Sequence, residues 1–207
     1  RDVVLSNGKV ELKFNTFLEK AYHYYRLGNE LQRKYGESMF WLRNRKVLNR
    51  IRYFFRKTRN IIEYSTSLVS TLIVDEVAKR NGTIIMEGLK NLKFNIPNNI
   101  DKNWRTRLNL LAYRKLQRKI EYKLSWNGLK AHYVNPRGTS SLCPRCGSKL
   151  VNIGYRRLKC PRCGFEGDRD SIACLNILKR FNHKWEGLGS PSTALPVTYD
   201  DPSEGGN

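Results

Sequence analysis

The chain has 207 residues, enough for one large domain, or one domain with a small insertion, and for a real hydrophobic core. Its 39 lysines and arginines outweigh 18 acidic residues, and the formal net charge of +21 predicts a polyanionic partner. Nucleic acid is favoured over a membrane surface, because no apolar run approaches the ~20 residues that a spanning helix needs.

A β-hairpin is predicted first, within residues 3–12, where two apolar alternations flank Asn7-Gly8. Asn-Gly tolerates the positive φ angles of a type I′ turn and is therefore a strong hairpin signal. From Thr16 to Tyr35 the apolar spacing becomes helical and rich in aromatic residues.

Residues 43–59 form a strongly basic segment, with eight lysines and arginines and no acidic residue. The segment also carries one helical apolar face, made by Val47, Leu48, Ile51, Phe54 and Phe55. A solvated charged face opposite a packed stripe would explain this pattern. A helix that contacts phosphates would explain it too, because counterion release favours such contacts. Both can hold at once, and we favour contact with nucleic acid, with Arg50, Arg56 and Lys57 as candidate contacts.

The helix is predicted to continue from Ile61 to Arg80, where Asn81-Gly82 ends it as a C-terminal cap. The run Thr83–Met86 is short, apolar and mostly β-branched, which predicts a strand buried on both faces. Glu87 stands at the far end of this strand, where a carboxylate needs a compensating partner.

A loop, a basic helix and a strand are predicted next. Residues 91–103 lack periodicity and predict a long loop. A single helix is predicted over Trp104–Trp126, with Arg114 and Arg118 as further candidate nucleic-acid contacts, and a strand over Ala131–Val134.

Four cysteines make the strongest local pattern in the chain. Cys143 and Cys146 form one Cys-Pro-Arg-Cys-Gly knuckle, and Cys160 and Cys163 form a second. Four thiolates at this spacing suit a closed, tetrahedral, structural zinc site, and so predict a zinc ribbon. Two disulfides are the alternative, but each would close a very small loop, and the cysteine usage fits a reducing cytoplasm.

Asp170 lies seven residues after Cys163 and opens an apolar-periodic segment that predicts a last helix. Taken alone, Asp168 and Asp170 both suit a helix N-cap, because their carboxylates can accept the orphan backbone N–H groups.

These motifs resemble the TnpB-type (OrfB-like) transposon-encoded nucleases, relatives of the type V CRISPR effectors. The phrases that carry the resemblance are Ile84-Ile-Met-Glu-Gly-Leu, Asn135-Pro-Arg-Gly-Thr-Ser-Ser-Leu-Cys-Pro-Arg-Cys-Gly, Cys160-Pro-Arg-Cys-Gly-Phe and Asp168-Arg-Asp-Ser-Ile-Ala-Cys-Leu-Asn-Ile-Leu. The resemblance implies an α/β fold with an RNase H-like (RuvC-type) nuclease core, a long helical insertion and an inserted zinc ribbon. It also implies DNA cleavage guided by RNA, in a prokaryotic, nucleoid-associated setting.

The resemblance assigns Glu87 and Asp170 as the second and third catalytic carboxylates, which would bind Mg²⁺. Asp168 then becomes a cap or a supporting group. The family's first catalytic Asp lies in a strand just before the hairpin, and that core strand is expected to be missing here. The chain is accordingly expected to be part of a longer protein or a decayed copy, with little or no cleavage of its own. A non-catalytic zinc-ribbon protein that binds nucleic acid is the alternative.

Four regions are expected. Residues 1–137 would form the core, with the helical insertion at about 17–80, and residues 138–167 the zinc ribbon. Residues 168–183 would form the last helix of the core, and residues 184–207, with Gly, Pro and Ser and few basic residues, a disordered tail.

Overall fold

A computed structural model describes residues 3–7, 11–36, 40–89, 101–110 and 112–186, and shows a mixed α/β protein. The chain divides into two compact units. The first unit comprises Arg1–Leu5 and Leu12–Pro136, and the second comprises Ser6–Glu11 and Arg137–Asn207. Among the described residues, no helix carries an apolar stretch long enough to cross a bilayer.

The predicted hairpin is present as strands β1 (Val3–Ser6) and β2 (Glu11–Phe14), which pair with each other. Its predicted turn at Asn7-Gly8 lies partly outside the described residues, because Gly8 is not described.

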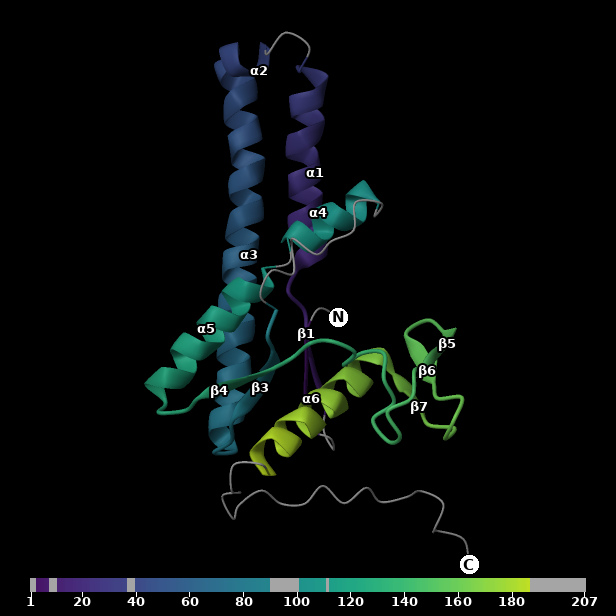
Figure 1. The fold of residues 1–207 in the computed structure, drawn as a ribbon. Coiled ribbons are helices and arrows are strands. Elements are labelled where there is room, and N and C mark those ends of the chain that lie inside the picture. The colour runs from purple at the N-terminus through teal and green to yellow at the C-terminus, as the bar shows by residue number, and fades with distance from the viewer. Residues whose placement is uncertain (1–2, 8–10, 37–39, 90–100, 111, 187–207) are drawn as a thin grey trace, which may run out of the picture. The chain divides into compact units, whose positions relative to one another are not determined.

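Two long helices, α1 (Leu18–Lys34) and α3 (Arg45–Lys79), lie side by side in the first unit, with the short helix α2 (Phe40–Arg43) between them in sequence (Figure 1). From Arg45 to Lys79, helix α3 covers the basic segment predicted over residues 43–59 and the predicted continuation over residues 61–80 as one helix. Asn44 caps it, since its side-chain oxygen accepts hydrogen bonds from the backbone N–H groups of Lys46 and Val47. Gly28 of α1 permits the close approach, because a Cβ there would meet the ring of Phe55 at 3.0 Å.

Helix α3 ends as predicted. Asn81 takes a left-handed φ of 46°, and the backbone N–H of Gly82 bonds the carbonyl of Val77. Strand β3 (Ile84–Glu87) follows and pairs in parallel with β4 (Ala131–Val134), with Glu87 opposite Val134. The strand is less buried than expected: Ile84 is buried, but Ile85 and Met86 are only half-buried, since β4 is its one partner strand among the described residues.

The prediction of a single helix over Trp104–Trp126 is wrong. The structure has α4 (Lys102–Leu110) and α5 (Tyr113–Trp126), and Ala112 between them leaves helical geometry with φ −88° and ψ 49°. The two pieces pack on different helices, α4 on α1 and α5 on α3 (Figure 1). The break therefore lets one basic stretch cover both long helices.

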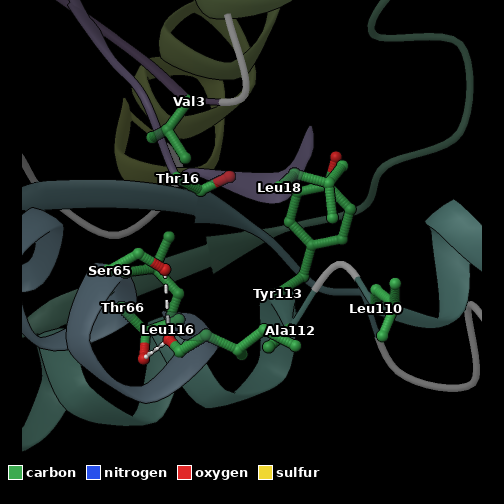
Figure 2. Close-up of a pocket in the computed structure, with 10 residues that line it drawn as sticks. Val3, Thr16, Leu18, Ser65, Thr66, Leu110, Ala112, Tyr113 and Leu116 are labelled. Atoms are coloured by element: carbon green, nitrogen blue, oxygen red, sulfur yellow. Dashed lines mark hydrogen bonds between the residues drawn. The ribbon is translucent and has the colours of Figure 1, made fainter. Parts of the chain in front are cut away.

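The hydrophobic core of the first unit lies where α3, α5 and β3 meet. Its buried members are Val69, Ile73, Val74, Val77, Ile84, Leu116, Ile120 and Leu124. A small hollow lies beside this core, lined by residues of β1, α1, α3 and α5 that include Leu18, Ser65 and Tyr113 (Figure 2). Its volume of about 20 Å³ suits little more than one water molecule, so it is a packing void and not a ligand site.

In its described residues, the second unit has a three-stranded antiparallel sheet and one helix. The strands are β5 (Val151–Gly154), β6 (Arg157–Lys159) and β7 (Glu166–Asp168), and α6 (Arg169–Glu186) follows directly. Helix α6 continues three residues past the predicted end at 183, and residues 187–207 of the predicted tail lie outside the described residues.

Candidate metal centre and nucleic-acid interface

The four predicted ligand cysteines come together in the second unit. Their sulfur atoms all lie within 4.8 Å of one another. The Sγ atoms of Cys143 and Cys163 are 3.5 Å apart, as are those of Cys146 and Cys160. A disulfide would need about 2.05 Å. Sulfurs bound to one zinc ion at ~2.3 Å lie about 3.8 Å apart in a tetrahedron, so the cluster fits one metal ion.

The two knuckles repeat one backbone pattern that aims the sulfurs inward. In the first, the N–H of Gly147 bonds the carbonyl of Cys143, and in the second, the N–H of Gly164 bonds the carbonyl of Cys160. Both glycines have φ +73°, a left-handed geometry that side-chain-bearing residues rarely adopt. The glycine after each cysteine pair therefore closes the turn, which is why the sequence repeats Cys-Pro-Arg-Cys-Gly.

The electrostatics of the thiols also favour a cation at their centre. Hydrogen bonds from the side chain and backbone of Ser148 lower the pKa of Cys146 to about 6. The backbone N–H of Phe165 acts to lower the pKa of Cys163, but burial and the neighbouring sulfurs raise it to about 12. Thiols this close cannot all ionise together unless a cation offsets their charge.

Helix α6 is fastened to the first knuckle by Asn176, which is buried. Its side-chain amide donates hydrogen bonds to the carbonyls of Thr139 and Leu142, at 2.7 and 2.8 Å. Ile172 of the same helix is fully buried against Cys143, Leu150 and Cys160. The cysteine cluster and α6 therefore form one packed body.

Asp170, the predicted third carboxylate, lies in the first turn of α6 and is paired with Arg156 from the turn between β5 and β6. This pairing raises the pKa of Arg156. Asp168 has its predicted role as a helix cap: its carboxylate accepts a hydrogen bond from the backbone N–H of Asp170 at 2.9 Å. Sequence reasoning missed Arg156 as the partner, because its left-handed φ of 59° and its approach to Asp170 appear only in the folded turn.

Glu87, the predicted second carboxylate, ends β3 in the first unit and is half-buried. Ile84 and Met86 pack on the core between α3 and α5. Because side chains alternate along a strand, Ile85 and Glu87 lie on the other face of the two-stranded sheet. Glu87 and Asp170 belong to different units, so the convergence of their carboxylates stays a prediction.

A polar side chain from α5 fixes the backbone at Glu87. The amide of Gln117, itself buried, donates to the carbonyl of Glu87 at 2.8 Å and accepts from Arg114 at 3.1 Å. Nearby on β4, burial raises the pKa of Tyr133 to about 12, with Glu121 adding to the shift. Arg114 therefore takes part in supporting β3, and both Arg114 and Arg118 are exposed on α5.

The three basic residues predicted on α3 are all exposed. The guanidinium of Arg50 lies over the rings of Tyr53 and Phe54, at 5.4 and 4.9 Å from their centroids, and the Lys57 ammonium lies 5.7 Å from the Tyr53 centroid. Such cation–π contacts hold the two side chains along the helix without neutralising them.

Comparisons with known proteins agree with these features. Residues 113–177 match the family model described as Cas12f1-like, TNB domain. A TnpB-like protein of Methanocaldococcus jannaschii is 43% identical over 129 residues, 62% of this chain and 46% of that protein. A second TnpB-like protein of that organism is 34% identical over 68% of this chain and 56% of its own length, so the chain spans about half of these relatives.

Two further matches are CRISPR effectors. The CRISPR-associated endodeoxyribonuclease Cas12f1 of Sulfoacidibacillus thermotolerans is 35% identical over 58% of this chain and 28% of its own length. A cryo-EM structure of a Cas12f1–sgRNA–target DNA complex has a TM-score of 0.50 and 28% identity, and covers 70% of this chain and 40% of that one. The chain is therefore a TnpB-type relative of the type V CRISPR effectors.

Proposed function

We propose that the chain is the nuclease module of an RNA-guided, Mg²⁺-dependent DNA endonuclease of TnpB type. The observation that carries this proposal is the similarity in both sequence and fold to Cas12f1, an endodeoxyribonuclease seen bound to guide RNA and target DNA. In the proposed fold, the first unit supplies an RNase H-like core with its helical insertion. Residues 138–167 supply a zinc ribbon, and α6 returns the chain to the core.

Glu87 and Asp170 would hold the magnesium. Mg²⁺ prefers hard oxygen ligands, usually one or two carboxylates with water and substrate phosphate. Bound Mg²⁺ would supply Lewis-acid activation of the scissile phosphate and of water. The residues fit this role in type and placement, because each carboxylate stands at the end of a regular element and is only partly exposed.

Arg156 supports the assignment of Asp170 as a cation-binding group. The paired guanidinium orients the Asp170 carboxylate and faces it with positive charge. A metal ion that binds Asp170 would have to displace the Arg156 guanidinium from at least one oxygen of the Asp170 carboxylate. The same guanidinium would then be free to meet a phosphate, with which it can form bidentate hydrogen bonds.

Zinc is the proposed occupant of the cysteine cluster, in a structural role. Four sulfur ligands leave no open position for substrate. The buried core of the second unit includes two of the ligands, Cys143 and Cys160, so metal binding would contribute directly to the stability of this unit.

DNA and a guide RNA are the proposed partners. The exposed basic residues Arg50, Arg56, Lys57 and Arg118 would contact phosphates, and each contact would gain from counterion release. Arg114 is proposed as a contact as well, although its hydrogen bond to Gln117 gives it a structural role too.

A zinc-ribbon protein that binds nucleic acid without cutting it is the second candidate. One observation favours it: Asp170 already has a cationic partner in Arg156, which satisfies its charge without any metal. The two candidates differ in whether Glu87 and Asp170 share a divalent ion.

Binding of Mn²⁺, a paramagnetic substitute for Mg²⁺, tests the proposal when followed by electron paramagnetic resonance. Glu87→Gln and Asp170→Asn should each weaken one binding site at least 10-fold, whereas Asp75→Asn, which removes an exposed carboxylate of α3, should leave it unchanged. Any metal-dependent nicking of DNA should likewise fall in the Glu87 and Asp170 variants and stay unchanged in Asp75→Asn. Mn²⁺ binding that ignores both variants, or nicking that survives Glu87→Ala, would overturn the nuclease assignment.

A further inference from the structure

Helix α3 is divided electrostatically along its length. Its first fifteen residues, 45–59, contain no carboxylate and seven exposed basic residues: Arg45, Lys46, Arg50, Arg52, Arg56, Lys57 and Arg59. None of the seven is ion-paired with a carboxylate in the part of the chain that the structure describes. In the second half of the helix, by contrast, Glu63 pairs with Lys115 and Lys119 of α5.

The basic residues fall on two stripes of the helix. At 3.6 residues per turn, successive side chains are rotated by about 100°. One stripe then contains Arg45, Arg52, Arg56 and Arg59, and the other contains Lys46, Arg50 and Lys57. The strip between them carries Asn49, Tyr53 and Asn60, of which both asparagines are exposed.

The opposite side of the same segment packs on α1. Phe54 lies 6.3 Å from Tyr24, ring centroid to centroid, and the hydroxyl of Thr58 donates to the carbonyl of Ala21 at 3.4 Å. Ile51, Phe54 and Thr58 are all buried. The exposed arc is thus a fixed surface, with amide and phenol groups in the middle and cations along both edges.

We infer that this surface, the first half of α3, lies in the major groove of double-stranded DNA. The inference rests on the proposed DNA partner and goes beyond it by naming the element and the groove. The two basic stripes would contact phosphates of the two strands, and Asn49, Tyr53 and Asn60 would face the base edges.

The dimensions agree with this placement. A rise of about 1.5 Å per residue makes the distance from Arg45 to Arg59 roughly 21 Å. That length matches about six base pairs at 3.4 Å per pair. The major groove of B-form DNA is about 12 Å wide and admits a helix, whereas the deep, narrow major groove of A-form RNA does not. Duplex DNA is accordingly the partner, and duplex RNA is not.

Fluorescence anisotropy with a 20-bp DNA duplex tests the inference. Two triple variants remove equal charge from the two stripes: Arg52→Gln with Arg56→Gln and Arg59→Gln, and Lys46→Gln with Arg50→Gln and Lys57→Gln. The charge-matched control is Lys20→Gln with Lys79→Gln and Lys130→Gln, three exposed lysines elsewhere in the first unit.

Each stripe variant should weaken duplex binding at least 10-fold and should reduce the slope of log K against log[salt] by about 2 to 3, because three phosphate contacts are lost. The control should change affinity less than 3-fold. DNA whose cytosines carry glucosyl groups in the major groove should bind the unmodified protein as weakly as plain DNA binds the stripe variants. Circular dichroism checks that the variants keep their helices.

Three results would overturn the inference: stripe variants that bind DNA like the control, equal binding of glucosylated DNA, or equal binding of an RNA duplex of the same sequence. These results would leave the proposed nuclease function standing. A chain that binds no DNA or RNA at all would instead remove the proposed function together with the inference.

Discussion

The guanidinium of Arg156 pairs with the carboxylate of Asp170, and thereby joins the turn between β5 and β6 to the first turn of α6. The backbone N–H of Arg169 reinforces this junction by bonding the carbonyl of Arg156 at 2.8 Å. Asp170 is thus held by a cation from the same compact unit. A divalent ion at Asp170 has to compete with that cation.

Replacing Arg156 should therefore strengthen metal binding, whereas replacing a metal ligand should weaken it. In Arg156→Gln, no guanidinium competes with the metal ion for the Asp170 carboxylate, and we therefore expect the affinity for Mn²⁺ to rise several-fold. The thermal midpoint of the second unit should fall by a few degrees, because a partly exposed ion pair contributes about 1 kcal/mol.

Arg157→Gln is the matched control. Its guanidinium lies 3.8 Å from Glu166, and its own side chain is 64% exposed, so both metal affinity and thermal midpoint should stay close to the original values. An Arg156→Gln protein with unchanged Mn²⁺ affinity would show that Asp170 is not a metal ligand, or that Arg156 does not compete for it.

Asn176→Ala should loosen the cysteine cluster, although Asn176 is not one of its ligands. The change leaves the buried carbonyls of Thr139 and Leu142 without their amide donor, which costs about 1–3 kcal/mol. Urea unfolding followed by zinc release to a chromophoric chelator measures the effect. Asn152→Ala removes one exposed hydrogen bond to the N–H of Gly154 and should cost less than about 0.5 kcal/mol. Equal midpoints for the two variants would refute the fastening role of Asn176.

Gly164→Ala should destabilise the second knuckle through backbone strain alone. The added Cβ meets nothing within 4 Å, but the residue has φ +73°, where alanine costs roughly 1–2 kcal/mol. Gly154→Ala also places its Cβ in open space, at a residue without positive φ, and should be nearly neutral. The same urea titration separates the two, and a neutral Gly164→Ala would contradict the strained geometry.

Removing the metal should unfold the second unit and spare the first. In Cys160→Ser one of four sulfur ligands is lost, and zinc content measured by mass spectrometry should fall well below one ion per chain. Far-UV circular dichroism should keep most of its helical signal, because α1, α3 and α5 belong to the first unit.

Cys174→Ser, which changes the cysteine outside the cluster, should retain zinc. Equal zinc content in the Cys160 and Cys174 variants would exclude the four-sulfur site.

Much of the fold follows from local sequence signals. The periodic apolar residues of α1 and α3, the Asn-Gly cap after α3 and the short run before Glu87 each determine their element with near neighbours alone. The cysteine cluster is equally local, because each knuckle is a five-residue turn that closes on its own glycine.

Tertiary contacts decide the features that the sequence did not reveal. The helix over Trp104–Trp126 breaks because its halves pack on different helices, which no spacing within the segment encodes. The ion pair between Arg156 and Asp170 and the hydrogen bonds from Asn176 to the first knuckle form only when the second unit is folded. The proposed convergence of Glu87 and Asp170 would likewise depend on tertiary structure, since the two residues belong to separate units.

Iron-directed cleavage of the protein backbone tests this convergence most directly. Fe²⁺ is added to the protein in place of Mg²⁺, and peroxide and ascorbate then generate hydroxyl radicals at the bound ion. The resulting fragments show which backbone segments lie beside the ion. We predict cuts beside both Glu87 and Asp170, and loss of both sets of cuts in Asp170→Asn. Cuts beside only one of these residues, or a set near Glu87 that persists in Asp170→Asn, would contradict a shared metal site.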